Sequence, residues 1–337
     1  MKARRLRSDF VSILEAIYSI ELSAEAWLKQ VISAASPALD EGVGVGGVLY
    51  RVGEQPLLRL DKIAAIGVPD GWIEIGAAVH EMPELQPDIK RTYETVLCAD
   101  QGDLANILPN YALAGGYFKE WNILGSMILN GYDVSGMGAC LHLFSRAPFK
   151  VSLSRRGLLT QMSTHLATGY RLQRRLAAAD AAAPVEAVLT PRGRIEHVEK
   201  AAESSEARAS LKEAVERRRW SQGRARNDNP ERAVAAWRGL VTGRWTLVDR
   251  FEHDGQRYIL ARENAPRGRR SVLLSERENQ VVALASLGRS NKLIAYELGL
   301  AHSTVRVLIA RAAMKLGTQS RSDLLSRFRQ GATERGI

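Results

Sequence analysis

The sequence LSERENQVVALASLGRSNKLIAYELGLAHSTVRVLIARAAMKLGTQSRSDLL, residues 274–325, decides the fold of the C-terminal part of the chain. Ser275, followed three residues later by Glu278, forms a capping box, in which each side chain satisfies a backbone N–H at the start of a helix. Glycines end the apolar runs that follow, so the pattern predicts a series of four short helices. The second is expected over Asn291–Leu298 and the third over His302–Leu316.

Three residues in the second and third helices have the spacing that two crossed helices require. Ala295 is small enough for a close approach, Gly299 tolerates a left-handed turn, and Val305 locks the third helix against the second. We therefore expect them to form the core of a helix-turn-helix. The outer face of the third helix is then free to enter a major groove, and it carries Ser303, Arg306, Ala310, Arg311 and Lys315.

The whole segment resembles the helix-turn-helix domain of the LuxR family. The matching residues are Leu274, Ser275, Arg277, Glu278, Gly288, Asn291, Lys292, Ile294, Ala295, Leu298, Thr304, Val305, Lys315, Leu316 and Arg321. The resemblance implies a sequence-specific, DNA-binding regulator of transcription whose partner is double-stranded DNA. It further implies that Arg306 and Val307 read base edges. The implied phosphate contacts are Lys292, Ser303, Thr304 and Arg311.

Two positions depart from the family pattern. Ala301 stands where a Ser or Thr often caps the recognition helix, which removes about 1 kcal/mol of capping. Leu308 stands where a His often contacts phosphate. We expect these departures to change the strength or the specificity of DNA binding.

The charge of the chain is concentrated at its C-terminal end. The 337 residues carry a net charge of +10, and residues 267–337 alone hold thirteen Lys and Arg against five Asp and Glu. A chain of this length favours two or three domains. A compact basic domain joined to a near-neutral body indicates that the first meets a polyanion and that the second has another role.

Composition also bears on location and on bound groups. Cys98 and Cys140 lie in apolar surroundings, and the six histidines show no metal-ligand spacing. The N-terminal MKARRLRSDF is not followed by the apolar stretch of a signal peptide, and no apolar run approaches the roughly 18 residues that span a bilayer. We expect a cytoplasmic protein that binds no membrane, metal or cofactor. No catalytic set is found, and the chain is not expected to be an enzyme.

Residues 1–180 have the pattern of a mixed α/β domain. Helices are expected near Phe10–Ile17, Trp27–Ala35 and 85–130, strands at Val43–Val52 and Gly136–Phe144, and a long closing helix over Ser154–Ala179. The long helix is either a dimer seam or a flank packed on its own sheet. In order and pattern the block resembles the GAF-like sensor domains found ahead of LuxR-type C-terminal domains.

Residues 184–266 form a smaller unit with two predicted hairpins, one around residues 190–193 and one around Asp254-Gly255. Polar helical segments over Ser204–Arg219 and Pro230–Leu240 lie between them. This arrangement resembles a small PAS-like α+β unit. A basic linker then leads to the helix-turn-helix domain of residues 271–334.

Three other patterns allow a functional and a structural interpretation. The glycine run of residues 42–47 suggests a nucleotide site, but it leads into a strand and not a helix, which favours a closely packed strand. His142 and His165 are expected to be structural. The aromatic cluster Tyr111, Tyr117, Phe118, Trp121 and Tyr132 is either core or the lining of a small-molecule pocket, for which Tyr117, Trp121 and Tyr132 are the candidate residues.

The sequence therefore predicts a multidomain, one-component regulator. An α/β sensor region binds an unidentified small molecule and controls the arrangement of a homodimer, and an all-α domain of four helices binds DNA. RNA polymerase is a further candidate partner. In the alternative hypothesis the front block is a protein-interaction module without a metabolite ligand.

Overall fold

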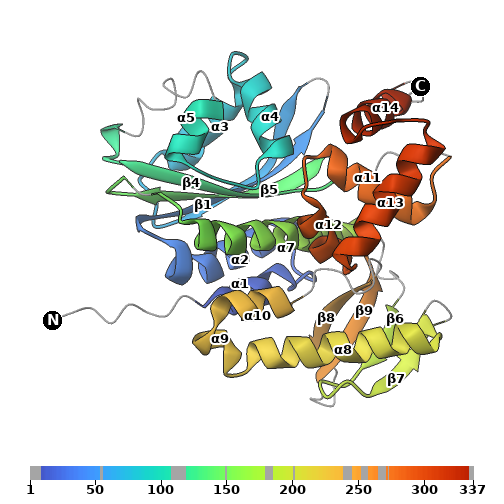
Figure 1. The fold of residues 1–337 in the computed structure, drawn as a ribbon. Coiled ribbons are helices and arrows are strands. Elements are labelled where there is room, and N and C mark those ends of the chain that lie inside the picture. Colours follow the sequence, from blue (N-terminus) through green and yellow to red (C-terminus); the bar gives the residue numbers. More distant parts are fainter. Residues whose placement is uncertain are drawn as a thin grey trace.

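The computed structural model describes residues 9–53, 56–107, 119–148, 150–178, 185–199, 202–237, 245–251, 257–264, 271 and 273–333. Figure 1 shows a first sheet between two layers of helices and a second sheet below them. The C-terminal helices lie at the side of the first sheet. The expected order, an α/β region followed by a four-helix C-terminal region, is confirmed.

The first sheet is antiparallel, with the strand order β2-β1-β5-β4-β3. Its strands are β1 (Gly42–Val52), β2 (Leu58–Ile66), β3 (Cys98–Asp100), β4 (Gly125–Tyr132) and β5 (Met137–Ser145). One face is covered by α3 (Trp72–Glu81), α4 (Gln86–Thr95) and α5 (Gln101–Ile107). The other face packs on α1 (Phe10–Ile17), α2 (Ala24–Leu39) and α7 (Leu153–Ala178).

The strands β2, β3 and β4 are absent from the sequence prediction. The interpretation of residues 85–130 as helical is wrong for Cys98–Asp100 and for Gly125–Tyr132, two strands whose residues are all buried. A strand covered on both faces lacks the alternation of apolar and polar residues that would reveal it. The glycine run of residues 42–47 does lie in a strand, and Gly46 leaves room for the ring of Trp72.

The long helix α7 lies inside the molecule. All residues from Met162 to Gln173 are buried, because the helix packs against the sheet, α1 and the C-terminal region. Of the two interpretations, the packed flank is therefore correct, and these residues cannot form a dimer seam. The helix lies close to β4 at Gly131, where a Cβ would be 2.5 Å from the backbone nitrogen of Ala167.

The second sheet is also antiparallel, with the order β7-β6-β9-β8. It contains β6 (Val185–Leu189), β7 (Ile195–Val198), β8 (Trp245–Phe251) and β9 (Arg257–Glu263). Between the hairpins come α8 (Ser205–Gln222), α9 (Ala225–Asp228) and α10 (Pro230–Ala236). The first hairpin turns at Gly193 with a positive φ of 81°. The turn predicted at Asp254-Gly255 lies outside the described residues.

The C-terminal helices are α11 (Glu276–Ser286), α12 (Asn291–Leu298), α13 (His302–Lys315) and α14 (Arg321–Thr333), close to the predicted bounds. Within the described part of the chain, no single helix has the length and apolar character needed to cross a membrane. Only α12 and α13 taken as one pair satisfy that test, and they are bent by 107°.

Gly131→Ala should destabilise the protein by about 1–3 kcal/mol, because the methyl group would press the backbone of α7 away from β4. Gly157→Ala is the matched control on α7, since a Cβ there meets no atom within 4 Å. In a helix this second change should stabilise by about 0.5–1 kcal/mol. Urea unfolding of both variants measures the difference, and equal stabilities would contradict the close approach.

Candidate nucleic-acid interface and ligand cavity

The helix-turn-helix is built from local signals in the sequence. Ser275 and Glu278 form both hydrogen bonds of the predicted capping box, and Ser290 caps α12 by accepting from the backbone N–H of Leu293. Gly299 ends α12 in the left-handed conformation with a φ of 63°. The resulting bend of 107° between α12 and α13 is within the range that helix-turn-helix motifs adopt.

The inner face of α13 is held by apolar packing. Val305 is fully buried against Val281, Ile294 and Leu298, and Ala295 lies in the same cluster. This packing fixes which face of α13 turns outward.

An ion pair also ties α13 to α11. The Lys315 ammonium lies 2.7 Å from the Glu278 carboxylate. Burial alone would raise the pKa of Glu278, but the hydrogen bonds from Lys315 and Ser275 keep it below its usual value. The pair therefore stabilises the domain at neutral pH and is lost as acid protonates the carboxylate.

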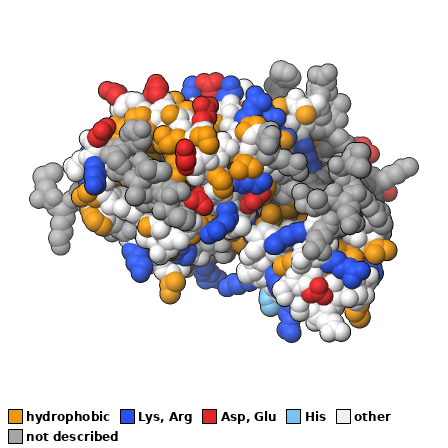
Figure 2. Space-filling model, turned by 90° about the horizontal axis from the view of Figure 1, so that it is seen from above, with side chains coloured by type: hydrophobic (Ala, Val, Ile, Leu, Met, Phe, Trp, Pro, Cys, Tyr) orange, Lys and Arg blue, Asp and Glu red, His pale blue; other side chains and the backbone are white. Residues whose placement is uncertain are grey.

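The predicted DNA contacts lie on the opposite, exposed face. Arg306 and Val307 project from α13, with Val307 47% exposed. The predicted phosphate contacts are exposed as well: Lys292 on α12, and Ser303, Thr304 and Arg311 on α13. Figure 2 shows basic side chains on the part of the surface that the C-terminal helices form. Ala301 gives α13 no side-chain cap.

Tyr296 is one of the residues that join this domain to the rest of the chain. The hydroxyl of Tyr296 on α12 lies 2.5 Å from Nε2 of His165 on α7 and donates to the carbonyl oxygens of Val234, at 3.0 Å, or Trp237, at 2.9 Å. On the far side of the imidazole, Nδ1 lies 2.8 Å from the Tyr18 hydroxyl. Burial lowers the pKa of His165 to about 3, so the ring is neutral.

The direction of each of these bonds follows from the carbonyl acceptors. Tyr296 uses its only hydroxyl proton on a carbonyl, so its oxygen accepts from Nε2–H of His165. The neutral ring then offers a lone pair at Nδ1, and Tyr18 donates to it. His165 is structural, as expected, and it also joins the front block to the C-terminal domain, which no pattern in the sequence indicates.

Charged groups are buried at the same junction. Arg289 is 3% exposed, and its Nη2 donates to the backbone oxygen of Tyr132 at 3.2 Å. Glu297 is also buried, which raises the pKa of its carboxyl group, although attraction to Arg289 opposes the shift. Close by, Arg171 forms an ion pair with Asp133, with 2.5 Å between Nη1 and Oδ1.

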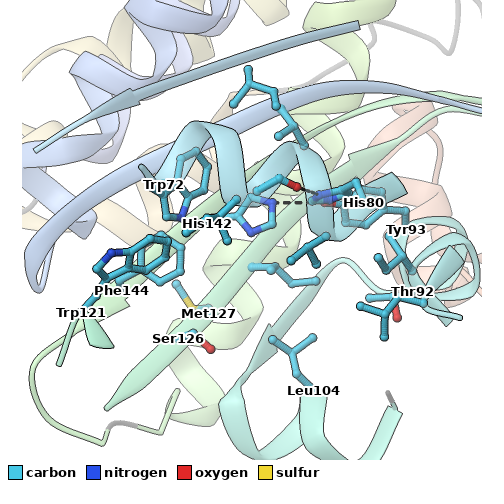
Figure 3. A pocket seen from close by; sticks show the side chains of 18 residues that line it. Trp72, His80, Thr92, Tyr93, Leu104, Trp121, Ser126, Met127, His142 and Phe144 are labelled. Carbon is cyan, nitrogen blue, oxygen red and sulfur yellow. Dashed lines mark hydrogen bonds between the residues drawn. The ribbon is translucent and has the colours of Figure 1, made fainter. Parts of the chain in front are cut away.

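A cavity lies between the first sheet and its covering helices. Its volume is about 140 Å³. Figure 3 shows aromatic side chains from helices and strands on its walls. Trp121, one of the three candidate pocket residues, lines it. Tyr132 does not, and is stacked on Tyr50 beside it. Tyr117 lies outside the described residues. Other lining residues include Val48, Ile63, Trp72, Val79, His80, Tyr93, Met127, His142 and Phe144.

Two histidines and a tyrosine are the polar centre of this cavity. The Tyr93 hydroxyl lies 2.7 Å from Nε2 of His80 and 3.1 Å from Nε2 of His142. Nδ1 of His80 lies 2.6 Å from the carbonyl oxygen of Gly76. Burial lowers the pKa of both rings, that of His142 to about 3. The three residues are far apart in sequence, so sequence reasoning did not group them.

A continuous set of contacts joins the cavity to the C-terminal domain. The backbone oxygen of Tyr93 accepts from Asn130 Nδ2 at 2.7 Å and lies 3.3 Å from the Tyr50 hydroxyl oxygen. The Tyr50 hydroxyl donates its one proton to Asn130 Oδ1 at 2.6 Å, and the Tyr50 ring stacks on Tyr132. Arg289 then binds the backbone of Tyr132. Within the described part of the chain, no group of three or more His, Cys, Asp or Glu could hold a metal ion.

Comparison with known proteins gives one family match. Residues 272–328 match the model of the luxR family of bacterial regulatory proteins. Among curated proteins, none matches the chain. Among solved structures, the chain is similar to crystalline SdiA from Escherichia coli, at 8% sequence identity and a TM-score of 0.35, over 93% of this chain and 92% of that chain. We draw nothing about function from a similarity at that level.

Ala301→Ser should stabilise the C-terminal domain by about 0.5–1 kcal/mol, because the hydroxyl would accept from an uncapped backbone N–H at the start of α13. The backbone already has the extended conformation of a cap, with φ −72° and ψ 147°. Ser290→Ala is the matched control, and it should cost a similar amount at α12. Thermal unfolding monitors both, and a destabilised Ala301→Ser would show that the site cannot accept a cap.

Proposed function

We propose that this chain, whose residues 272–328 belong to the LuxR family of bacterial regulatory proteins, is a one-component regulator in which a small molecule bound by the front region controls DNA binding. The observation that supports it most is the presence in one chain of an exposed recognition helix and an apolar cavity joined by hydrogen bonds and stacking. The family consists of DNA-binding regulators of transcription and not of enzymes.

In this proposal α13 enters the major groove. Arg306 donates to a base edge, most favourably to O6 and N7 of guanine, and Val307 contacts an apolar base edge. Lys292, Ser303, Thr304 and Arg311 bind phosphates and fix the register without reading sequence. The exposure of all six side chains supports these roles, because no part of the described chain covers them.

The front region, residues 1–180, acts as the sensor domain. The cavity lies between a sheet and its covering helices, and it has the lining usual for ligand pockets, with apolar and aromatic side chains around a few polar groups. The alternative is that the front block binds a partner protein. The small size and apolar lining of the cavity favour the small molecule, because a protein partner needs a broad surface.

Ligand binding would reach the DNA through the docking of the C-terminal domain. The contacts from Tyr93 through Tyr50 and Tyr132 to Arg289 provide a route, and residues 184–266 brace the same junction through Trp237. Two copies of residues 271–334 would meet a two-fold operator as a homodimer, with half-sites about one helical turn apart. A shift of the docked domain changes the spacing of the two recognition helices.

Selection of genomic DNA fragments by the full-length chain tests the proposal. The expected result is a set of two-fold sites near promoters. A fluorescence titration of one such site, with and without compounds from a metabolite panel, then tests the sensor. A compound that stabilises the chain against heat and changes DNA affinity supports it, whereas recovery of DNA without sequence preference contradicts it.

Arg306→Ala should relax sequence preference, with a loss of about 1–3 kcal/mol on the selected site and little change on unrelated DNA. Lys292→Ala should weaken binding to all sequences alike and flatten its dependence on salt. Binding isotherms at several salt concentrations separate the two effects. Unchanged binding of the selected site by Arg306→Ala would remove that residue from base reading.

Tyr296→Phe should loosen the docking of the C-terminal domain, because it removes the hydroxyl that joins His165 on α7 to the backbone of Val234 or Trp237. Hydrogen exchange of α12 amides should speed up while α11 and α13 stay protected. Tyr170→Phe is the control, since Tyr170 is buried on α7 but its hydroxyl makes no hydrogen bond to the described residues. The same exchange rates in both variants would argue against docking through Tyr296.

A further inference from the structure

The polar centre of the cavity has a fixed direction of hydrogen bonding. The carbonyl oxygen of Gly76 can only accept, so Nδ1 of His80 carries a proton. Because burial keeps His80 neutral, its Nε2 has a lone pair and accepts from the Tyr93 hydroxyl. That hydroxyl has no second proton to give.

The consequence falls on His142. The Tyr93 oxygen can only accept from it, so Nε2 of His142 carries the proton in the 3.1 Å contact. The neutral ring therefore has its lone pair at Nδ1, for which no hydrogen-bond partner exists among the described residues. The carbonyl of Gly76 thus sets, through three side chains, which nitrogen of His142 remains an acceptor.

The surroundings of this acceptor limit what can bind it. Among the described residues that line the cavity there is no Asp, Glu, Lys or Arg. The ring of His142 stacks on Phe144 and lies edge-on to Trp72. Such a site desolvates a charged ligand without an opposite charge to compensate it, which is costly. A neutral, apolar molecule avoids that cost.

From this geometry we propose that the cavity binds a neutral, largely apolar small molecule that carries an O–H or N–H group and donates it to Nδ1 of His142. The inference rests on the proposed sensing function and adds the chemical class of the ligand. A ligand with an ether or ester oxygen in that position would place an oxygen lone pair against the lone pair of Nδ1 of His142, and the two would repel each other. An anionic ligand would bring an uncompensated charge into the cavity.

The first test is the tautomer itself, measured in the full chain without ligand. Long-range ¹H–¹⁵N correlation spectra distinguish imidazoles protonated at Nδ1 from those protonated at Nε2. The expected result is a proton on Nε2 of His142 and on Nδ1 of His80, with neither ring becoming charged around neutral pH. A proton on Nδ1 of His142 would overturn the inference before any ligand is added.

The second test uses three probes of similar shape: 2-naphthol, which donates an O–H, 2-methoxynaphthalene, which cannot donate, and the anion 2-naphthoate. The full chain should bind 2-naphthol at least about tenfold more tightly than the ether. That ratio of dissociation constants corresponds to one hydrogen bond to a buried acceptor. The anion should bind most weakly. His142→Phe should abolish the preference for 2-naphthol over the ether, while His197→Phe, on an exposed strand, should keep it.

The outcomes separate the two levels of the proposal. Equal binding of 2-naphthol and its ether by the unaltered chain overturns the donor inference but leaves the cavity as a small-molecule site. A preference that survives in His142→Phe overturns the role of that residue. If none of the probes binds, the cavity is not a ligand site, and both the inference and the proposed sensing function fail.

Discussion

A neutral imidazole between two hydroxyl groups connects the three parts of this molecule. His165 accepts a hydrogen bond from Tyr18 and donates one to Tyr296. The Tyr296 hydroxyl in turn donates to the carbonyl oxygen of Val234 or Trp237. Each partner comes from a different part of the chain. A protonated ring could not accept from Tyr18, so the arrangement depends on burial holding the pKa of His165 far below neutrality. Together with the buried contact between Arg289 and Tyr132, these bonds hold the C-terminal domain against the front region.

The two functional regions differ in how far sequence reasoning could reach. The helix-turn-helix was predictable because its signals are local: a capping box, glycines at helix ends, and a buried valine six residues after Gly299. The cavity was not, since His80, Tyr93 and His142 meet only when β5 pairs with β1 and the helices cover that face. The strand β4 is also not predictable, because it is buried on both faces and has no alternating pattern.

The polar groups of the cavity differ from those at the junction between the front region and the C-terminal domain. In the cavity, the polar cluster of His80, Tyr93 and His142 is neutral and its protons have one consistent direction, which leaves Nδ1 of His142 open as an acceptor. The junction instead buries Arg289 and Glu297, and the Nε atom of Arg289 has no partner among the described residues. Buried charge contributes little net stability, because desolvation offsets attraction. A junction of this kind can therefore be displaced by a modest change in its surroundings.

The burial of α7 has a consequence for the order in which the protein folds. Its contacts reach across long stretches of chain, from Tyr18 at one end to Tyr296 at the other. The C-terminal helices contact mainly each other and form quickly, whereas pairings between distant segments form slowly. During synthesis the front region emerges first, with Nε2–H of His165 still without its acceptor. The last step of folding is then the docking of α12 onto α7. A chain truncated before α12 would leave that surface of α7 exposed, with His165 lacking its bond to Tyr296, and chaperones and proteases would recognise it.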